Sequence, residues 1–141
     1  QERYFGATRP DTQHILFSVT KSFVGTIAEL LIAEGKLNPD VKAADYVAEL
    51  AGSGLGDASV RNILDMRTGL AFSEDYVPGQ SGITDVQRMS IAGAWLPRHA
   101  DYTGPDGHFA LVASLGKNTA HGGDFVYRTP NTTALQWIVE R

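Results

Sequence analysis

The feature that most constrains the fold is the stretch of residues 18–34, in which apolar side chains recur at helical spacing. Its strongest apolar positions lie three or four residues apart, which predicts a helix, and they are Val19, Phe23, Ile27, Leu30 and Leu31. The flanking positions are apolar as well, so nearly every side of this helix has to be buried. Ser18 lies at its start, where serine is a favoured capping residue, and Gly35 is a natural C-terminal stop.

Shorter helical patterns follow, and the sequence predicts almost no sheet. Ser59 can cap one of these helices, and Thr84 with Gln87 forms a capping box for another. Because Pro130 disfavours helical backbone in the residue before it, we expect the last helix to be capped by Asn131 or Thr132. The expected helices lie near residues 41–50, 59–69, 84–95, 109–115 and 131–139. The pattern of residues 109–115 is also compatible with a strand. Residues 125–127 are expected to be extended.

The composition excludes several classes of function. The 141 residues provide room for one domain, and their 43% hydrophobic and 20% charged residues are ordinary for a globular protein. A net charge of −4 argues against a nucleic-acid partner. The sequence also contains no run of about 18 apolar residues, which would be needed to predict insertion into a membrane. The chain has no cysteine, which excludes disulfides, zinc-thiolate sites and cysteine nucleophiles. Its four histidines lack ligand spacing, so we expect neither a metal nor another cofactor.

The two ends of the chain suggest a piece of a longer protein. The sequence opens at Gln1 without an initiating methionine or a signal-peptide pattern. It ends at Arg141, in the middle of a helical pattern. We therefore expect a domain that is incomplete at both ends, and the lack of a leader pattern favours the cytoplasm.

The strongest candidate for chemistry is the pair Ser18 and Lys21 at the start of the apolar helix. A serine hydroxyl is a poor nucleophile until a nearby base takes its proton. A spacing of three on a helix places both side chains on one face, so Lys21 can accept the Ser18 proton directly or through a relay. The positive end of the helix favours the alkoxide and the oxyanion that follows. An S-x-x-K pattern alone is weak, because one is expected by chance in roughly every second chain of this length.

The residues around Ser18 and Lys21 resemble a motif of a known protein family. Residues 17–23, read as F-S-V-T-K-S-F, closely resemble the active-site helix of class C β-lactamase-like serine hydrolases. That family includes penicillin-binding proteins, esterases derived from them, and hydrolases of 6-aminohexanoate (nylon) oligomers. Three further segments match in the family's chain order: residues 35–40 after the helix, residues 60–70 as V-R-N-I-L-D-M-R-T-G-L, and residues 125–138 around F-V-Y-R-T-P-N.

The resemblance implies an α/β (α+β) fold of the β-lactamase/transpeptidase type. Residues 1–141 would be the central, helix-rich part of a single serine hydrolase catalytic domain. The antiparallel sheet of that fold would lie mostly in segments before and after this stretch. We therefore expect an exposed apolar face near the Ser18 helix, or other segments or chains covering it.

The resemblance also places Tyr127 on the family's catalytic tyrosine. An ammonium such as that of Lys21 stabilises a neighbouring phenolate, and the pair can then deprotonate Ser18 and return the proton to the leaving group. Whether Lys21 or Tyr127 is the formal base stays open, as it does in related enzymes. The backbone N–H of Ser18 would form half of an oxyanion hole.

Three further residues are assigned to substrate binding. Thr129 presents a hydroxyl where many class C β-lactamases have the asparagine of a Y-S-N motif, which favours esterases and amidases over β-lactamases. Tyr76 lies in a loop resembling that of nylon-oligomer hydrolases, whose tyrosine contacts the scissile amide. It is expected to donate a hydrogen bond to the substrate, although a solvent-facing loop tyrosine fits equally well. Asn131 falls on the asparagine that ends the second motif.

The family's third motif, K-T-G or H-x-G on a strand after the tyrosine, is missing from this stretch. Residues 117–119 and 121–123 look similar to it, but both precede Tyr127. His121-Gly122-Gly123 also resembles a lipase oxyanion loop, yet no G-x-S-x-G elbow accompanies it. We interpret it as a turn.

Taken together, the sequence predicts a serine hydrolase that cleaves linear amides or esters through an acyl-enzyme. The leading specific substrates are 6-aminohexanoate oligomers, so the expected partner is a small-molecule amide or ester. One alternative is a β-lactamase or D-alanyl carboxypeptidase. Another is a non-catalytic binding module of the same fold that kept the motif by descent.

Overall fold

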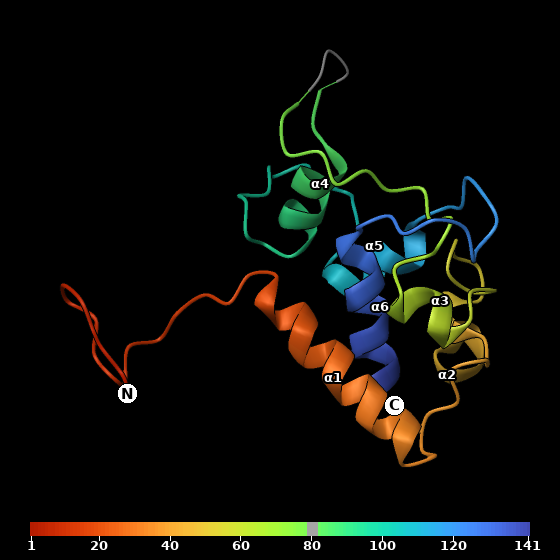
Figure 1. Cartoon of the computed structure of the whole chain (residues 1–141). Helices are drawn as coiled ribbons and strands as arrows, with labels where there is room; N and C mark the ends of the chain where they lie inside the picture. Colours follow the sequence, from red (N-terminus) through yellow and green to blue (C-terminus); the bar gives the residue numbers. More distant parts are fainter. Residues whose placement is uncertain (79–81) are drawn as a thin grey trace.

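The computed structural model describes residues 1–78 and 82–141, and these residues are mostly helix and loop (Figure 1). Within them, extended pairing is confined to two isolated antiparallel bridges, Lys42 with Ser59 and Leu70 with Lys117. None of their helices is both long enough and apolar enough to cross a membrane. The helical elements are α1 (Val19–Ala33), α2 (Ala43–Tyr46), the 3-10 helix η1 (Ala48–Leu50), α3 (Val60–Leu64), α4 (Asp85–Ala92), α5 (His108–Ser114) and α6 (Thr129–Val139).

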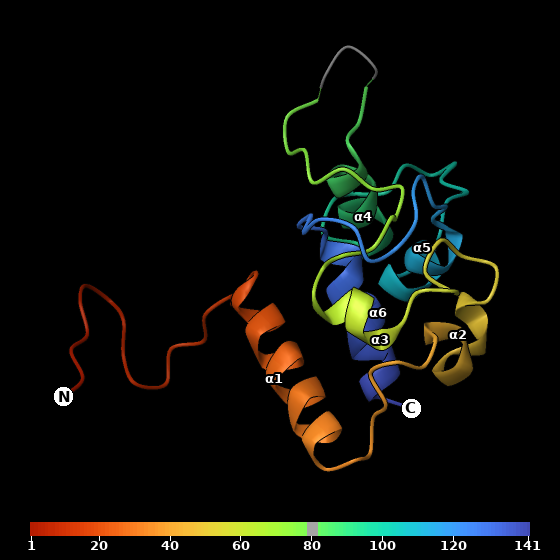
Figure 2. The same ribbon diagram turned by 45° about the vertical axis from the view of Figure 1, so that its right-hand side comes forward.

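The last helix, α6, lies at the centre of the fold. It packs against α1, α3 and α5, and Figure 2 shows it surrounded by these helices from a second direction. Six of its eleven residues are buried, including Leu135 and Ile138. The core continues from α6 into the other elements through fully buried side chains such as Leu50, Ile63 and Val112. Residues that start α1 and residues that start α6 are thereby brought together.

Helix α1 begins and ends as predicted, but it is buried on one side only. The positive φ of Gly35 (69°) allows the backbone N–H groups of Gly35 and Lys36 to bond back to carbonyls of the last turn. The prediction that nearly all sides are buried is wrong for the isolated chain, because only Val24 and Ala28 are buried. The outer face is apolar and exposed, with Phe23, Ile27 and Leu30 at 58%, 46% and 57% exposure. The expectation of an exposed apolar face near the Ser18 helix is therefore confirmed.

The helix ends follow local sequence signals where a side-chain cap is available. Ser59 with Asn62 and Thr84 with Gln87 form reciprocal capping boxes at α3 and α4. Both helices end earlier than predicted, because positive φ angles at Met66 (53°) and Ala94 (58°) turn the chain away. The 109–115 pattern is a helix, α5, and not a strand.

The start of α6 differs from the prediction. The helix begins at Thr129, so neither Asn131 nor Thr132 is its cap. Pro130 lies in its first turn, where the missing N–H has no intrahelical partner to lose. The extended residue is Arg128, with φ −145° and ψ 118°, one position earlier than the rule for residues before proline suggests.

A close backbone approach at Gly69 joins two distant loops. The Gly69 carbonyl accepts hydrogen bonds from the N–H groups of Asn118 and Thr119, and the Gly69 N–H donates to Nδ1 of His121 at 3.0 Å. A Cβ atom at this position would lie 1.9 Å from the Thr119 carbonyl oxygen. Only glycine fits here, so this residue fixes how the loop after α3 meets the loop after α5.

We predict that Gly69→Ala lowers the free energy of unfolding by about 1–3 kcal/mol or more, because one of the two backbones has to move. Gly52→Ala is the matched control, since no atom lies within 4 Å of its Cβ position and its φ is ordinary. We expect the control to change stability by less than about 0.5 kcal/mol. Urea unfolding followed by circular dichroism measures both, and equal stabilities of the two variants would contradict the close approach.

Candidate active site

Ser18 is the N-cap residue of α1, but its side chain does not cap the helix. Its backbone is helical (φ −72°, ψ −7°), and its hydroxyl makes no bond to the first-turn N–H groups. Instead, Oγ accepts two hydrogen bonds, one from Lys21 Nζ at 3.0 Å and one from Tyr127 Oη at 2.6 Å. The expected capping role of the serine is therefore replaced by contacts to the two side chains predicted to act on it.

Lys21 and Tyr127 also contact each other. Nζ of Lys21 lies 5.1 Å from the centre of the Tyr127 ring, within the range of a cation–π interaction. Lys21 lies one turn along α1 from Ser18, as its spacing predicts, whereas Tyr127 comes from a segment 109 residues later. Three side chains predicted from two separate motifs thus meet at one oxygen atom.

Phe17, directly before Ser18, has a left-handed backbone with φ 45°. Such a conformation costs of order 1–3 kcal/mol in a non-glycine residue and persists only where its surroundings enforce it. Its carbonyl accepts from the N–H of Thr20, which continues the turn into α1. The Phe17 ring lies 6.4 Å from that of Trp95. Sequence reasoning missed this strained residue, because no local signal marks a phenylalanine at positive φ.

Tyr127 lies outside regular secondary structure and is held through its neighbours. The N–H of Val126 donates to the Met66 carbonyl at 2.9 Å. On the other side, Arg128 donates to the carbonyls of Phe72 and Thr68 at 3.0 and 2.9 Å. Burial lowers the pKa of the Arg128 guanidinium, and these two carbonyls compensate part of its lost hydration. The sequence showed Arg128 only as a departure from the family motif.

A cleft of about 290 Å³ opens beside Ser18. It is bounded by the start of α1, the loop before residue 78, α4 and the first two turns of α6. Its walls are mixed, with apolar side chains from α4 opposite hydroxyls from α6. The lining residues include Ser18, Lys21, Glu74, Tyr76, Met89, Trp95, His108, Thr129, Thr133 and Gln136.

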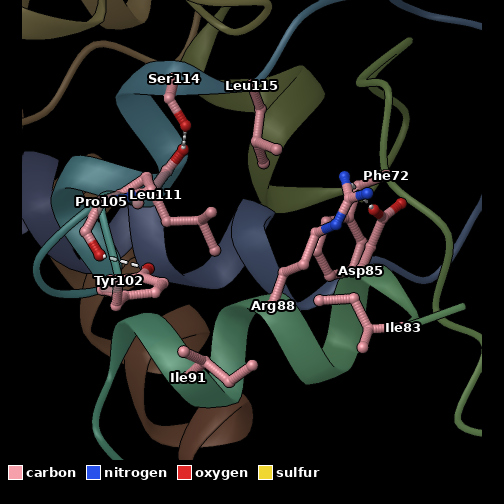
Figure 3. A pocket seen from close by; sticks show the side chains of 11 residues that line it. Phe72, Ile83, Asp85, Arg88, Ile91, Tyr102, Pro105, Leu111, Ser114 and Leu115 are labelled. Atoms are coloured by element: carbon pink, nitrogen blue, oxygen red, sulfur yellow. Dashed lines mark hydrogen bonds and ion pairs between the residues drawn. The ribbon is translucent and has the colours of Figure 1, made fainter. Parts of the chain in front are cut away.

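A second cavity, of about 310 Å³, is lined by a different set of α4 residues (Figure 3). Its walls are mainly apolar, and Figure 3 shows Leu111 and Leu115 beside it, with Arg88 and Asp85 at one edge. None of the residues predicted to be catalytic or to bind substrate lines this cavity. The Ser18 cleft is therefore the candidate active site.

Two of the predicted substrate-binding residues, Thr129 and Tyr76, line the Ser18 cleft, and both bind Glu74. The Thr129 N–H donates to Oε2 of Glu74 at 2.8 Å, and its hydroxyl donates to Oε1 at 2.5 Å. The Tyr76 hydroxyl donates to the same Oε1 at 3.2 Å. Sequence reasoning missed Glu74, which was visible only as an acidic residue in the Tyr76 loop.

The bond to Glu74 changes what Tyr76 can offer to a substrate. Burial raises the pKa of the Tyr76 phenol, and the negative charge of Glu74 raises it further, so the phenol stays protonated. Its single proton is donated to Glu74, which leaves the oxygen lone pairs without a protein donor among the described residues. In this arrangement the Tyr76 oxygen can still accept a hydrogen bond, and its expected role as a donor to the substrate stays a prediction.

The third predicted substrate-binding residue, Asn131, does not reach the cleft. Its exposure is 0%, and its Oδ1 accepts from the Thr68 hydroxyl at 2.8 Å. Because α6 begins two residues before the predicted cap, residue 131 faces the core. In this structure Asn131 joins α6 to the loop after α3, and its assignment to substrate binding stays a prediction.

Residues 117–123 also lie away from the cleft. Lys117 and His121 both bind the carboxylate of Asp57, and these contacts lower its pKa to about 2. His121 accepts the Gly69 N–H on Nδ1, so in its neutral form the proton is on Nε2 and points to Asp57. The H-G-G sequence forms a turn, as predicted, with Gly122 at φ 84°. Across residues 1–78 and 82–141, no group of three His, Asp or Glu side chains is placed to hold a metal ion.

Two proteins similar to this chain over nearly its whole length are described as 6-aminohexanoate-dimer hydrolases. One, from Paenarthrobacter ureafaciens, is 38% identical over 140 residues, which are 99% of this chain and 34% of that protein. The other is a solved structure of a Bacillus anthracis protein given that description provisionally; it has a TM-score of 0.84 and 24% identity, over 99% of this chain and 36% of its own. The chain thus spans about a third of the length of each.

A shorter similarity links the chain to a β-lactamase of Providencia stuartii, 31% identical over 86 residues, which are 61% of this chain and 21% of that protein. The solved structure and the family model together support a fold of the β-lactamase type. The family model named Beta-lactamase matches residues 1–141, the whole of the sequence. The chain therefore belongs to the beta-lactamase family.

Proposed function

We propose that this chain carries the nucleophile and the proton-transfer groups of a serine hydrolase, which cleaves linear amides or esters through an acyl-enzyme. The observation that supports the proposal is the meeting of Lys21 Nζ and Tyr127 Oη at Ser18 Oγ, at 3.0 and 2.6 Å. Both distances allow direct proton transfer from a serine hydroxyl. Ser18 and Lys21 line a cleft large enough for a short linear substrate.

The proposed reaction begins when Ser18 Oγ attacks the substrate carbonyl carbon. The member of the Lys21–Tyr127 pair that is in its basic form takes the Ser18 proton, and the other stabilises it by charge or hydrogen bonding. Within the described residues the Ser18 N–H donates to no protein group, and it lies at the positive end of α1. It is therefore free to bind the oxyanion of the tetrahedral intermediate.

The intermediate collapses when the C–N or C–O bond breaks and the pair returns the proton to the leaving amine or alcohol. Ser18 is then acylated. A water molecule attacks the ester carbonyl, gives its proton to the same pair, and releases the acid, which regenerates the Ser18 hydroxyl. No step needs a metal or a redox cofactor.

We propose 6-aminohexanoate oligomers as the leading substrates. The Paenarthrobacter ureafaciens protein described as a 6-aminohexanoate-dimer hydrolase is 38% identical to the chain. Tyr76 lies in the cleft with its acceptor lone pairs available for a scissile amide N–H, and the Thr129 hydroxyl is committed to Glu74. The similarity to a Providencia stuartii β-lactamase supports β-lactam hydrolysis as the second candidate.

We also propose that residues 1–141 are the central, helix-rich part of the catalytic domain. Two facts support this: the chain spans about a third of its relatives, and the outer face of α1 is apolar and exposed. Further segments of the same protein, carrying the sheet, would cover that face. They would also bring the missing third motif and the second oxyanion donor.

We predict that Ser18→Ala removes nearly all hydrolysis of a p-nitrophenyl ester by the complete protein, with a loss of about a thousandfold or more. Ser22→Ala, one turn further along α1 on an exposed position, is the matched control and should retain the parent rate. A fluorophosphonate probe should label the parent at Ser18. Parent-like hydrolysis by Ser18→Ala would refute the assignment, and an unlabelled parent would favour a binding module.

We predict that the complete protein prefers a short linear ester or the 6-aminohexanoate dimer to a chromogenic cephalosporin. The reason is that Tyr76 offers an acceptor in the cleft, whereas residue 129 has no side-chain amide and its hydroxyl proton is already donated to Glu74, so it cannot donate to a β-lactam side chain. The ratio of kcat/KM values for the two substrates measures the preference. A higher value for the cephalosporin would support the β-lactamase alternative instead.

We predict that residues 1–141 expressed alone are less stable than the complete protein and are poor catalysts. Each exposed aliphatic side chain on α1 forgoes about 1.5–3 kcal/mol of burial, against a typical net stability of about 5–15 kcal/mol. A missing oxyanion donor costs about a hundredfold or more in rate. Urea unfolding and ester turnover of the two forms test this, and matching stability and turnover would show that nothing covers α1.

A further inference from the structure

Glu74 is the one acidic side chain among the described residues that line the Ser18 cleft. It accepts hydrogen bonds from the backbone and hydroxyl of Thr129 and from the Tyr76 hydroxyl. Within the part of the chain that the structure describes, no lysine, arginine or histidine pairs with it. A partly buried carboxylate without a cation is costly unless it is hydrogen-bonded. These three donors therefore explain how the charge is tolerated in the cleft.

The bond to Thr129 supplies a cap that α6 otherwise lacks. The first N–H groups of a helix have no partner within the helix, and the N-cap residue of α6, Arg128, makes no side-chain cap. Oε2 of Glu74 accepts the N–H of Thr129, the first residue of α6, at 2.8 Å. A carboxylate at this end is also favoured by the helix dipole. Glu74 thus caps α6 from a loop 55 residues away in sequence.

The capped residue is two positions from the proposed catalytic phenol. Tyr127 lies in an irregular stretch, so its place depends on bonds to the residues on either side. Val126 is tied to Met66 before it, while Arg128 and Thr129 are tied after it. Of these ties, only the one through Glu74 lies in the cleft and reaches the substrate-side residue Tyr76 as well.

We infer that Glu74 is a positioning residue: by capping α6 through Thr129, it holds Tyr127 at hydrogen-bond distance from Ser18, and it directs the Tyr76 hydroxyl at the same time. The inference rests on the proposed function of Ser18, Lys21 and Tyr127. A purely structural cap would affect only the stability of the protein, whereas a positioning residue also affects the rate of the chemical step. Loss of the carboxylate should slow the chemical step in a protein that is still folded, because a displacement of about 1 Å near reacting groups costs about a hundredfold in rate.

The test compares Glu74→Gln in the complete protein with variants of its partner. Thr129→Val removes the hydroxyl but keeps the shape and the N–H, and Thr129→Ser keeps both donors. Glu49→Gln is the matched control, since Glu49 binds Arg141 just beyond the other end of α6 and lies outside the cleft. Steady-state hydrolysis of a p-nitrophenyl ester gives kcat and KM, and thermal unfolding shows whether each variant is folded.

We expect Glu74→Gln to lower kcat about 10- to 100-fold with KM changed less than about threefold. Fluorophosphonate labelling of Ser18 should slow by a similar factor. Glu49→Gln should match the parent. Thr129→Ser should have a higher kcat than Thr129→Val, because it keeps the hydroxyl that binds Glu74, and the kcat of Thr129→Val should lie between those of the parent and of Glu74→Gln. The double variant Glu74→Gln/Thr129→Val should be no slower than Glu74→Gln alone, because both changes break one connection.

Three results would overturn the inference: a folded Glu74→Gln protein with parent kcat, a loss confined to KM, or additive losses in the double variant. If Glu74→Gln does not fold, the comparison of Thr129→Val with Thr129→Ser decides, and equal kcat values overturn the inference. Failure of the proposed function looks different. In that case the parent is not labelled at Ser18 and Ser18→Ala retains activity, which overturns both claims together.

Discussion

The attachment of residues 121–131 to the loop after α3 is the constraint on which the rest of the site depends. Tyr127 has no helix or strand of its own to hold it, yet its hydroxyl lies 2.6 Å from an oxygen at the start of α1. The loop after α3 forms hydrogen bonds with more than half of the residues in this segment. The bonded pairs are Arg67 with Gly122, Gly69 with His121, Met66 with Val126, Thr68 and Phe72 with Arg128, Glu74 with Thr129, and Thr68 with Asn131.

This arrangement explains why the loop after α3 contains so many special backbone positions. Met66 has a left-handed φ of 53°, and Gly69 approaches another backbone too closely for any side chain. Both features turn carbonyls and N–H groups outward from the loop, where residues 121–131 can use them. An irregular segment can place a catalytic group accurately when a rigid neighbour satisfies its backbone in this way. Phe17, directly before Ser18, also has a left-handed backbone, so both sides of the Ser18–Tyr127 contact are flanked by unusual backbone positions.

The parts of this structure that follow local rules were predictable from the sequence. The bounds of α1, the cap at Ser59, the capping box at Thr84, and the shared face of Ser18 and Lys21 depend on residues a few positions apart. Tyr127 was placed only through the family resemblance, since no local rule joins residues 109 positions apart. Glu74 was missed because its partner lies in a distant segment.

The errors at the start of α6 share one physical cause. The sequence offered Asn131 and Thr132 as local caps, and Pro130 argued against helical backbone at Thr129. The helix nevertheless begins at Thr129, because a distant carboxylate takes over the capping and Arg128 adopts the extended backbone instead. That shift turns Asn131 inward and leaves Thr129 in the cleft. A tertiary contact thus decided which residues of the motif face the cleft.

The exposed apolar face of α1 also affects the contact between Ser18 and Tyr127, because Ser18 lies at the start of α1. α6 packs against α1, in which Val24 and Ala28 are buried while Phe23, Ile27 and Leu30 are exposed. Residues 1–16 run away from the body in both views and do not cover this face (Figures 1 and 2). The distance from Ser18 to Tyr127 spans the junction of α1 with α6, so any tilt of α1 changes it directly. Under the proposed function, cover on the outer face of α1 would therefore act on catalysis as well as on stability. It would fix the proposed nucleophile, Ser18, against Tyr127, the proposed proton-transfer group that does not belong to α1.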